Sequence, residues 1–389
     1  MISKLEAEKY YRDSLKRGLC SADKAVVFYS KKALDKRLDL LRSTFPNGTN
    51  HAIAIKTCNH IEVLSHIVAR GFGLEAASIE EVLLAKKAGA KNEKIVFDSP
   101  VKTRFEIQKC HEEFPGILLN ANSLEELARY PTNFNAKIGL RINPLVDNSG
   151  GSYFNVSTPN SKFGVPISKY QEIIDHCIHY TAVSCLHFHI GSNLTDLSPN
   201  IDAISKVITL ALKINKKRKE QGIKTHIDTL DIGGGIEFDA TTIKVFVASM
   251  LQIPNIEKFS LITEYGNFIH KYNSFVVSNI EYVISNAANL PDLAYIHVGA
   301  DLFVRKVYSQ LNTEYPCTVL QSDSFASSQK IKSYTIVGPL CFAGDVLFKN
   351  IKLTEIKEGD KLFIYNIGAN TLSMWSGHCS RELPEFLFL

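Results

Sequence analysis

Several side chains that can do chemistry follow short apolar runs of the sequence. Lys56 comes directly after HAIAI, and His187 and His189 close the run VSCLHFH. A glycine triplet (233–235) follows IDTLDI, and Glu264 ends FSLITE. If each run is a strand of one parallel barrel, these residues gather at the same end of it. The sequence therefore predicts a single site that combines an amine, imidazoles, a glycine loop and a carboxylate.

Each of these residues also has a simpler interpretation. A lysine at the mouth of an apolar strand suits Schiff-base chemistry, because desolvation lowers its pKa, but it can equally extend from the rim into water. A glycine triplet lets backbone N–H groups approach an anion, or makes a tight packing turn. Glu264 can pair with a ring nitrogen or with another side chain. His187 and His189 point the same way along a strand, but no third metal ligand fits the pattern, which favours stacking or packing.

The combination is more specific than any one of its members. An amine for an aldehyde, a glycine loop for a phosphate and an acid for a pyridinium nitrogen are the partners that pyridoxal 5′-phosphate needs. The sequence thus predicts pyridoxal phosphate as the cofactor and no metal.

The elements that must position these residues alternate along the chain. Apolar runs are separated by amphipathic segments such as 61–70 and 79–89. Strands that are apolar on both faces and alternate with helices indicate a parallel sheet. Eight such units predict a (β/α)8 barrel rather than an open doubly wound sheet. The predicted strands are 51–56, 72–77, 94–98, 116–120, 137–142, 183–189, 227–232 and 259–264.

The pattern changes after about residue 275, where strand-like runs follow one another with little helix. This change predicts a β-rich C-terminal domain. VVFYS (26–30) is also strand-like, so the N-terminal segment is assigned to the same domain. We therefore expect an α/β protein with a barrel at 36–275 and a β-rich domain made of 1–35 and 276–389.

Several segments resemble those of the fold-type III pyridoxal-phosphate decarboxylases, the group of diaminopimelate and ornithine decarboxylases. IAIKTCNH matches the segment of the Schiff-base lysine, here Lys56. GFGLEAASIEE matches the second-strand motif, with Glu75 where the family usually has Asp. LHFHIGS matches the segment whose histidine stacks on the cofactor ring, here His189, with Ser192 near the phosphate.

The resemblance continues to the C-terminal part of the chain. LDIGGGIEF is similar to the phosphate loop of the family. TEYGN stands in place of Glu-Pro-Gly-Arg and keeps Glu264 and Gly266. GPLCFAGDVL matches the segment of the decarboxylase cysteine, here Cys341.

The resemblance implies the alanine racemase/ornithine decarboxylase type of fold and a homodimer with shared active sites, in which Cys341 reaches the neighbour's Lys56. It implies that Glu264 keeps the ring nitrogen protonated and that Cys341 or Lys56 returns a proton after carbon dioxide leaves. The implied catalytic residues are Lys56, His189 and Cys341. The implied cofactor-binding residues are Lys56, Glu75, Arg141, His189, Ser192, Gly233, Gly234, Gly235, Glu264, Gly266, Asn267 and Asn370.

Departures from the family pattern bear on the substrate. Phe342 stands where the family has an acid for a distal ammonium, so free ornithine, lysine and diaminopimelate are not expected substrates. Asn267 and Asn370 replace an Arg and a Tyr of the family. Arg305 is either a surface residue or, with Tyr308, a grip for a substrate carboxylate. The predicted substrate residues are Arg305, Tyr308, Phe342, Asp345 and Arg381.

We therefore expect decarboxylation of an amino acid or amino acid conjugate to an amine, for example in siderophore or antibiotic assembly. A racemase on the same fold is one alternative, but Cys341 stands where such racemases use a Tyr. A non-catalytic relative is the other alternative, because Asn267 and Asn370 weaken cofactor and substrate contacts.

Composition argues against other classes of protein. Lys plus Arg is 44 and Asp plus Glu is 40, a net charge of +4 that does not indicate binding to nucleic acid or to a membrane surface. No apolar run approaches the length of a bilayer span. The eight cysteines form no CxxC pair, and the polar N-terminus has no apolar signal core, so we expect a cytoplasmic protein with reduced thiols.

Overall fold

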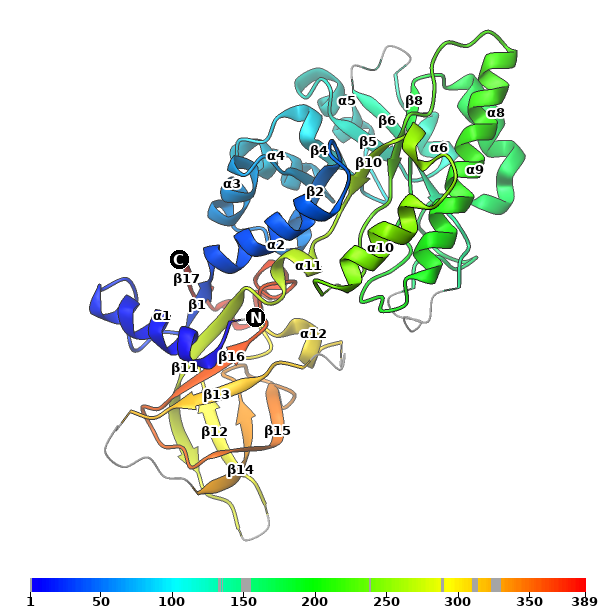
Figure 1. The fold of residues 1–389 in the computed structure, drawn as a ribbon. Helices are drawn as coiled ribbons and strands as arrows, with labels where there is room; N and C mark the ends of the chain where they lie inside the picture. The colour runs from blue at the N-terminus through cyan, green and yellow to red at the C-terminus, as the bar shows by residue number, and fades with distance from the viewer. Residues whose placement is uncertain are drawn as a thin grey trace. The chain divides into compact units, whose positions relative to one another are not determined.

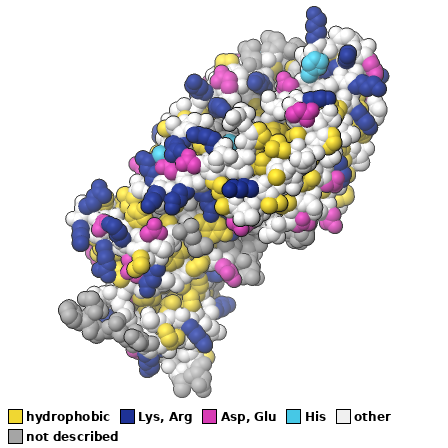
Figure 2. Space-filling view, viewed as in Figure 1, with side chains coloured by type: hydrophobic (Ala, Val, Ile, Leu, Met, Phe, Trp, Pro, Cys, Tyr) yellow, Lys and Arg dark blue, Asp and Glu magenta, His cyan; other side chains and the backbone are white. Residues whose placement is uncertain are grey.

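The computed structural model describes residues 2–389 except 132, 133, 135, 148–154, 238, 288, 289, 310–313 and 323–329. The chain divides into two compact units, one of residues 37–268 and one of residues 1–36 and 269–389 (Figure 1). Among the described residues, no helix is both long and apolar enough to cross a membrane. On the face drawn in Figure 2, basic side chains are dispersed with acidic ones among them.

The first unit is a closed barrel of eight parallel strands. Each strand pairs in parallel with the next around the ring, and β10 pairs back with β2, which closes it. The predicted (β/α)8 barrel is therefore confirmed, with each strand inside or overlapping its predicted run. The strands are β2 (Asn50–Ala54), β3 (Gly73–Ala76), β4 (Ile95–Phe97), β5 (Leu118–Ala121), β6 (Lys137–Asn143), β8 (Val183–His187), β9 (Thr229–Asp231) and β10 (Ser260–Thr263), with the short β7 (Val165–Pro166) beside β6.

Helices alternate with these strands, and several begin at a serine or threonine cap. The side-chain oxygens of Ser78, Thr103 and Ser123 accept hydrogen bonds from backbone N–H groups three residues later, at 3.2, 3.1 and 3.1 Å. Each cap satisfies an N–H group that the helix itself cannot pair. The helices are α2 (Lys31–Thr44), α3 (Ile61–Ala69), α4 (Ile79–Lys87), α5 (Arg104–Glu113), α6 (Leu124–Leu127), α8 (Tyr170–His179), α9 (Ser198–Glu220), α10 (Thr242–Leu251) and α11 (Asn267–His270), with short 3₁₀ turns at Ile55–Thr57, Asn92–Lys94, Ile167–Lys169 and Ile256–Lys258.

The inside of the barrel changes from apolar to polar along the strands. A buried apolar cluster consists of Ala52, Val96, Leu118, Cys185 and Ile262. Side chains two residues apart on a strand share a face, so the next inward positions after four of these are Asp98, Asn120, His187 and Glu264. All four are buried. The polar residue that ends each apolar run is thus carried to one end of the barrel.

The second unit is a mixed sheet centred on the long strand β11. Its first half pairs antiparallel with β1 and β16, and its second half with β12. β1 also pairs with β17 in parallel, so the N-terminal strand lies in this sheet. The strands are β1 (Val26–Tyr29), β11 (Ser274–Ile284), β12 (Asp292–Ile296), β13 (Cys317–Leu320), β14 (Ile331–Val337), β15 (Val346–Thr354), β16 (Lys361–Tyr365) and β17 (Glu385–Phe388), with helices α1 (Lys4–Lys16) and α12 (Val304–Val307) and 3₁₀ turns at Leu372–Met374 and His378–Ser380.

The boundary between the units differs from the sequence-based expectation. The barrel unit ends at residue 268, and the expected boundary was at 275. Ser274 and Phe275 already belong to β11, where they pair with Tyr29 and Phe28 of β1. Strand pairing with the N-terminal segment, which local pattern does not reveal, moves these residues into the sheet unit.

A buried ion pair, that of Lys102 and Glu126, ties together the loops after β4 and β5. Lys102 Nζ lies 2.9 Å from Glu126 Oε1 and donates to the backbone oxygens of Ser99 and Asn120 at 2.9 and 2.6 Å. The Lys102 side chain is fully buried and that of Glu126 is 7% exposed. A buried charge is tolerated only when it is paired, so each residue depends on the other.

We predict that Lys102→Met lowers the free energy of unfolding by about 3–5 kcal/mol, because it leaves the Glu126 carboxylate buried and unpaired. Lys206→Met is the matched control, since the Lys206–Asp202 pair has the same distance of 2.9 Å but lies on the surface of α9. The control should cost less than about 1 kcal/mol. Urea unfolding followed by circular dichroism measures both, and equal losses would contradict the prediction.

Candidate active site

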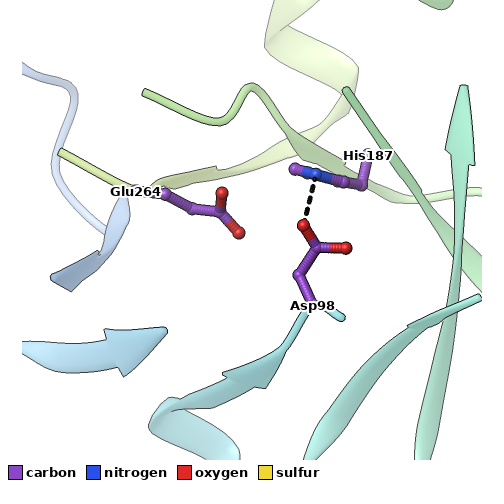
Figure 3. Close-up of side chains that lie close together, drawn as sticks. All are labelled: Asp98, His187 and Glu264. Carbon is purple, nitrogen blue, oxygen red and sulfur yellow. Dashed lines mark ion pairs between the residues drawn. The ribbon is translucent and has the colours of Figure 1, made fainter. Parts of the chain in front are cut away.

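A ring of polar side chains occupies the carboxyl end of the barrel. Asp98, His187 and Glu264 come from the ends of β4, β8 and β10 and point toward one another (Figure 3). One carboxylate oxygen of Asp98, one of Glu264 and one ring nitrogen of His187 all lie within 4.8 Å of one another. Inside this end of the barrel also lie Lys56, Glu75, Asn120, Arg141 and Asp231.

The first contact of the ring joins Lys56 to Glu75. Lys56 Nζ forms an ion pair and hydrogen bond with Glu75 Oε2. The Lys56 side chain is 50% exposed, whereas the Glu75 side chain is fully buried. Desolvation lowers the pKa of Lys56, but the carboxylates of Glu75 and Glu264 outweigh it, so the net shift of this pKa is upward. The expectation that the barrel mouth lowers the pKa of this lysine is therefore wrong, because the barrel brings two carboxylates to it.

The second contact is a chain of charges through His187. Arg141 Nη1 lies 2.7 Å from Asp98 Oδ2, and His187 Nε2 lies 3.3 Å from the same oxygen. On the other side of the ring, His187 Nδ1 lies 3.3 Å from Asp231 Oδ2. Burial alone lowers the pKa of His187, but Asp231 and Asp98 raise it well above its ordinary value. Burial raises the pKa of Asp98, but Arg141 and His187 hold it well below its ordinary value.

Asp98, His187 and Glu264 are also residue types that bind metals. The oxygen of Asp98 that faces His187 is, however, already held by the Arg141 guanidinium at 2.7 Å. The positive charge of Arg141 repels a metal cation that would bind the same oxygen. The arrangement is therefore better described as a paired charge network than as a metal centre.

The glycine triplet forms a loop that no larger residue could form. Gly233 and Gly235 have φ angles of +63° and +90°, which favour glycine. A Cβ at Gly235 would lie 1.8 Å from the backbone oxygen of Gly191, and one at Gly234 would lie 2.5 Å from that of Glu264. The loop therefore packs against the segments that follow β8 and β10, and it is both a tight turn and a stretch of closely approachable backbone.

His189 connects this loop to β8. The backbone N–H of Gly234 donates to His189 Nδ1 at 3.1 Å. Burial, reinforced by the charges of Arg141 and Lys56, lowers the pKa of His189 to about 3, so its ring is neutral and Nδ1 can accept. Ser192, the other predicted residue of this segment, is half-buried in the turn after Gly191.

Glu264 is one of several members of the ring with unused hydrogen-bonding capacity, together with Glu75, Asp98, Asn120 and His187. Among the described residues, the buried Oε1 atom of Glu264 has no hydrogen-bond partner. Burial and the nearby Asp231 carboxylate raise the pKa of Glu264 well above its ordinary value. The ring contains four buried carboxylates, those of Glu75, Asp98, Asp231 and Glu264, but its cationic groups are three, those of Lys56, Arg141 and His187. The ring thus contains one carboxyl group more than it has cationic groups, and an additional N–H⁺ group would balance it.

The loop after β10 brings two further predicted residues to this end. A Cβ at Gly266 would lie 2.4 Å from Thr57 Cγ2, so glycine lets this loop approach the residue after Lys56. Asn267 Nδ2 donates to Asn193 Oδ1 at 3.1 Å, next to Ser192. The structure therefore gathers the predicted barrel residues, from Lys56 to Asn267, at one end of one unit.

The remaining predicted residues lie in the sheet unit. Cys341 is exposed. The rings of Phe342 and Tyr308 stack with centroids 5.3 Å apart. Asn370 takes a φ angle of +55° in the turn before the 3₁₀ turn Leu372–Met374.

The other three predicted residues of the sheet unit hold protein groups. Arg381 Nε lies 2.8 Å from Asp301 Oδ2, Asp345 accepts backbone N–H groups of Ala300 and Leu340 at 2.6 and 2.7 Å, and Arg305 Nε donates to Met374 Sδ at 3.2 Å.

Sequence reasoning missed Asp98, Asn120 and Asp231. Asp98 and Asn120 end the predicted strands KIVFD and GILLN, and Asp231 is the last residue but one of IDTLDI. A polar residue at the carboxyl end of an apolar run was the signal that could have identified them. His187 was considered, but its charge partners became visible only when the strands closed into a ring.

Comparison with known proteins agrees with this geometry. Residues 31–270 match the family model described as "Pyridoxal-dependent decarboxylase, pyridoxal binding domain", and residues 203–368 match its "C-terminal sheet domain". The chain is 30% identical to a diaminopimelate decarboxylase of Helicobacter pylori over 349 residues, which cover 86% of this chain and 82% of the relative. It is 26% identical to one of Archaeoglobus fulgidus over 368 residues, which cover 90% and 84%.

Solved structures of decarboxylases share the fold of this chain. The crystal structure of Helicobacter pylori diaminopimelate decarboxylase complexed with L-lysine superposes with a TM-score of 0.84 at 26% identity, covering 97% of this chain and 94% of that chain. A lysine/ornithine decarboxylase of Vibrio vulnificus shares the fold with a TM-score of 0.80 over 100% of both chains. This chain therefore belongs to the pyridoxal-dependent decarboxylases, amino acid carboxy-lyases that use pyridoxal phosphate.

Proposed function

We propose that this enzyme decarboxylates an amino acid derivative that carries a second, distal carboxylate, of the kind formed when amino acids are conjugated in siderophore or antibiotic assembly. The observation that carries the proposal is the pocket that begins at Phe342, directly after Cys341. Its lining combines aromatic rings with lysines and contains no acidic residue among those described.

The barrel residues are proposed to hold the cofactor. Lys56 supplies the primary amine for its covalent attachment, and the loop of Gly233, Gly234 and Gly235 offers its backbone to the phosphate. Glu264, with its unpartnered oxygen, holds the proton of the ring nitrogen. Bound pyridoxal phosphate supplies the electron sink that allows the α-carboxylate to leave as carbon dioxide. His189, neutral and fixed by Gly234, offers a flat face for stacking.

The pocket beside Cys341 is proposed to bind the distal end of the substrate. It has a volume of about 910 Å³ and is lined by Lys306, Tyr308, Phe342, Phe348 and Lys349 together with small and aliphatic residues. Lys306 Nζ lies 5.0 Å from the centroid of the Phe348 ring, and burial lowers its pKa. The two lysines of this surface attract a carboxylate and repel an ammonium group.

Neither lysine was predicted from the sequence, which pointed instead to Arg305 and Arg381. Arg381 is already paired with buried Asp301, and Asp345 is occupied by backbone N–H groups. We therefore assign the distal carboxylate to Lys306 and Lys349, and retain Tyr308 and Phe342 as the aromatic wall. Their stacked rings support this assignment.

Cys341 is proposed to return the proton to Cα in the site of a second copy of the chain, as the family resemblance implies. The exposure of Cys341 in the isolated chain is compatible with that role. The homodimer with shared active sites is likewise a proposal. Oligomeric state measured by light scattering tests it, since a catalytically active monomer would contradict it.

We predict that Lys56→Ala abolishes the absorbance band between about 300 and 500 nm that borohydride traps in the wild type, because the covalent link needs this primary amine. Lys94→Ala is the control, since Lys94 is a half-buried lysine that precedes β4 at the other end of the barrel. A wild-type protein that stays colourless after incubation with pyridoxal phosphate would contradict the proposal and favour a non-catalytic role.

We predict that Gly235→Ala weakens binding of pyridoxal phosphate by at least about tenfold, because the added Cβ collides with the Gly191 oxygen and displaces the loop. Gly222→Ala is the matched control. Its φ angle of +73° imposes similar backbone strain, but its Cβ meets nothing within 4 Å. Cofactor titration followed by absorbance measures both, and equal affinities in the two variants would refute the assignment of the loop.

We predict that carbon dioxide release is fastest with amino acids bearing a distal carboxylate and at least about tenfold slower with ornithine and lysine. Lys306→Ala should raise KM for the carboxylate substrates, and Phe342→Glu should shift preference toward the diamines, because it restores an acid. Diaminopimelate carries a distal carboxylate and a distal ammonium group. Its rate of carbon dioxide release therefore shows which of the two groups decides whether the pocket accepts a substrate. Rapid turnover of ornithine and lysine by the wild type would overturn the substrate proposal and leave the decarboxylase assignment intact.

A further inference from the structure

A further cavity of the barrel unit lies at the amino ends of the strands β2, β3 and β4. It has a volume of about 290 Å³, and Arg42, His51, Phe72 and Lys94 are among the residues that line it. We call it the amino-end cavity. Lys56 and Asp98, by contrast, follow the carboxyl ends of β2 and β4. The amino-end cavity therefore takes no part in the proposed reaction.

The lining of the amino-end cavity is positively charged. Arg42 and Lys94 contribute two cations, and no acidic residue lines the cavity among those described. Asp39, one helical turn before Arg42 on α2, pairs instead with Arg70. Within the described part of the chain, neither Arg42 nor Lys94 has a carboxylate partner. An anion between these two cations would lower the electrostatic energy of the cavity.

Both cations are positioned by neutral groups. Arg42 Cζ lies 4.5 Å from the centroid of the buried Phe72 ring, and Arg42 Nη2 donates to the backbone oxygen of Arg70. Lys94 Nζ donates to Asn50 Oδ1 at 3.2 Å. These contacts use a minority of the N–H groups that a guanidinium and an ammonium group carry. Each side chain therefore keeps its full charge and further N–H donors for a ligand.

His51 adds a buried imidazole to the same cavity. The residue is 7% exposed, and its Nδ1 atom lies 2.8 Å from Thr263 Oγ1. Its Nε2 atom has no hydrogen-bond partner among the described residues. Burial, reinforced by the charges of Arg42 and Lys94, lowers the pKa of His51 to about 4, so the ring is neutral. With the Thr263 hydroxyl as the donor to Nδ1, the ring proton is on Nε2 and can be donated to a ligand.

We propose that the amino-end cavity binds a phosphate group, either of inorganic phosphate or of a small phosphate ester, through Arg42, Lys94 and His51. A guanidinium can pair with two oxygens of a phosphate, and an ammonium group adds a compact charge. A phosphate monoester carries a charge of about −1.5 to −2 at neutral pH, which two cations balance. The cavity is near the lower end of the roughly 300–1,000 Å³ typical of small-molecule sites, which suits a small ligand.

The test is isothermal titration calorimetry of the holoenzyme with inorganic phosphate. Phosphate should bind, and Arg42→Gln and Lys94→Gln should each weaken its binding at least about tenfold, because each removes a charged hydrogen-bond donor. Arg42 is exposed and Lys94 is half-buried, so both variants should fold. Absence of phosphate binding, or binding that neither substitution weakens, would overturn the inference and leave the decarboxylase assignment intact.

Arg37→Gln is the matched control for Arg42→Gln. Arg37 also belongs to α2, and its Cζ atom lies 5.0 Å from the centroid of the Phe268 ring, but it does not line the cavity. Lys306→Ala is the control for the cationic pocket of the sheet unit. Both controls should keep the affinity of the wild type for phosphate. An equal loss in Arg37→Gln would mean that phosphate responds only to the overall charge of the protein, and a loss in Lys306→Ala alone would place the site elsewhere.

The ring ¹⁵N resonances of His51 locate the bound phosphate. Phosphate should shift these resonances in protein labelled at histidine, in which His51 is assigned by the signal that His51→Gln lacks. No shift at saturating phosphate would contradict the proposed placement. Should His51→Gln fail to fold, the calorimetry of Arg42→Gln and Lys94→Gln decides the inference.

Succinate and glycerol 3-phosphate define the chemistry of the ligand. Succinate carries two charges on separate carboxylates and should bind more weakly than phosphate, so equal or tighter binding of succinate would overturn the assignment to a phosphate group. Tighter binding of glycerol 3-phosphate than of inorganic phosphate would support a phosphate ester as the ligand. The reverse order would support inorganic phosphate itself.

Discussion

The compensation of charge inside the barrel is the constraint on which the site depends. Four carboxyl groups are carried to one end of the buried barrel interior, beyond an apolar cluster of inward side chains. Burying ionised groups costs far more free energy than a domain has to spare unless each group is paired. Lys56, Arg141 and His187 supply three of the pairings. Glu264, whose Oε1 has no partner among the described residues, is the group that we propose to face the cofactor's ring nitrogen.

The same constraint explains why the site is divided among many strands. Neighbouring strands are about 5 Å apart, so residues at successive strand ends meet across the ring at contact distance. Asp98 contacts Arg141 and His187, which are 43 and 89 positions away in the chain. No single segment contains the network, and each strand contributes one polar residue beyond an apolar stretch. The residues that we propose to bind the cofactor lie in the barrel unit, and the aromatic and cationic pocket that includes Phe342 lies in the sheet unit.

Much of the fold and part of the candidate site could be predicted from the pattern of residue types along the chain. The eight barrel strands, the helix caps and the roles expected for Lys56, the glycine triplet and Glu264 depend on residue type and on spacing along the chain. The pKa of Lys56 could not be read in this way, because its direction depends on Glu75 and Glu264, which come from other strands. Arg381 illustrates the same limit, since it was expected to be available to substrate but is paired with Asp301, 80 positions away.

The sequence by itself therefore determined the architecture, the family and the chemical types present, because apolar periodicity and short motifs are properties of neighbouring residues. Only the tertiary structure decided which charges compensate which. It placed His187 between Asp98 and Asp231, left an oxygen of Glu264 without a partner among the described residues, and assembled Lys306 and Lys349 with the aromatic wall of Phe342. The physical reason is that electrostatic and packing energies depend on distance through space, which the closure of the barrel and the pairing of distant strands create.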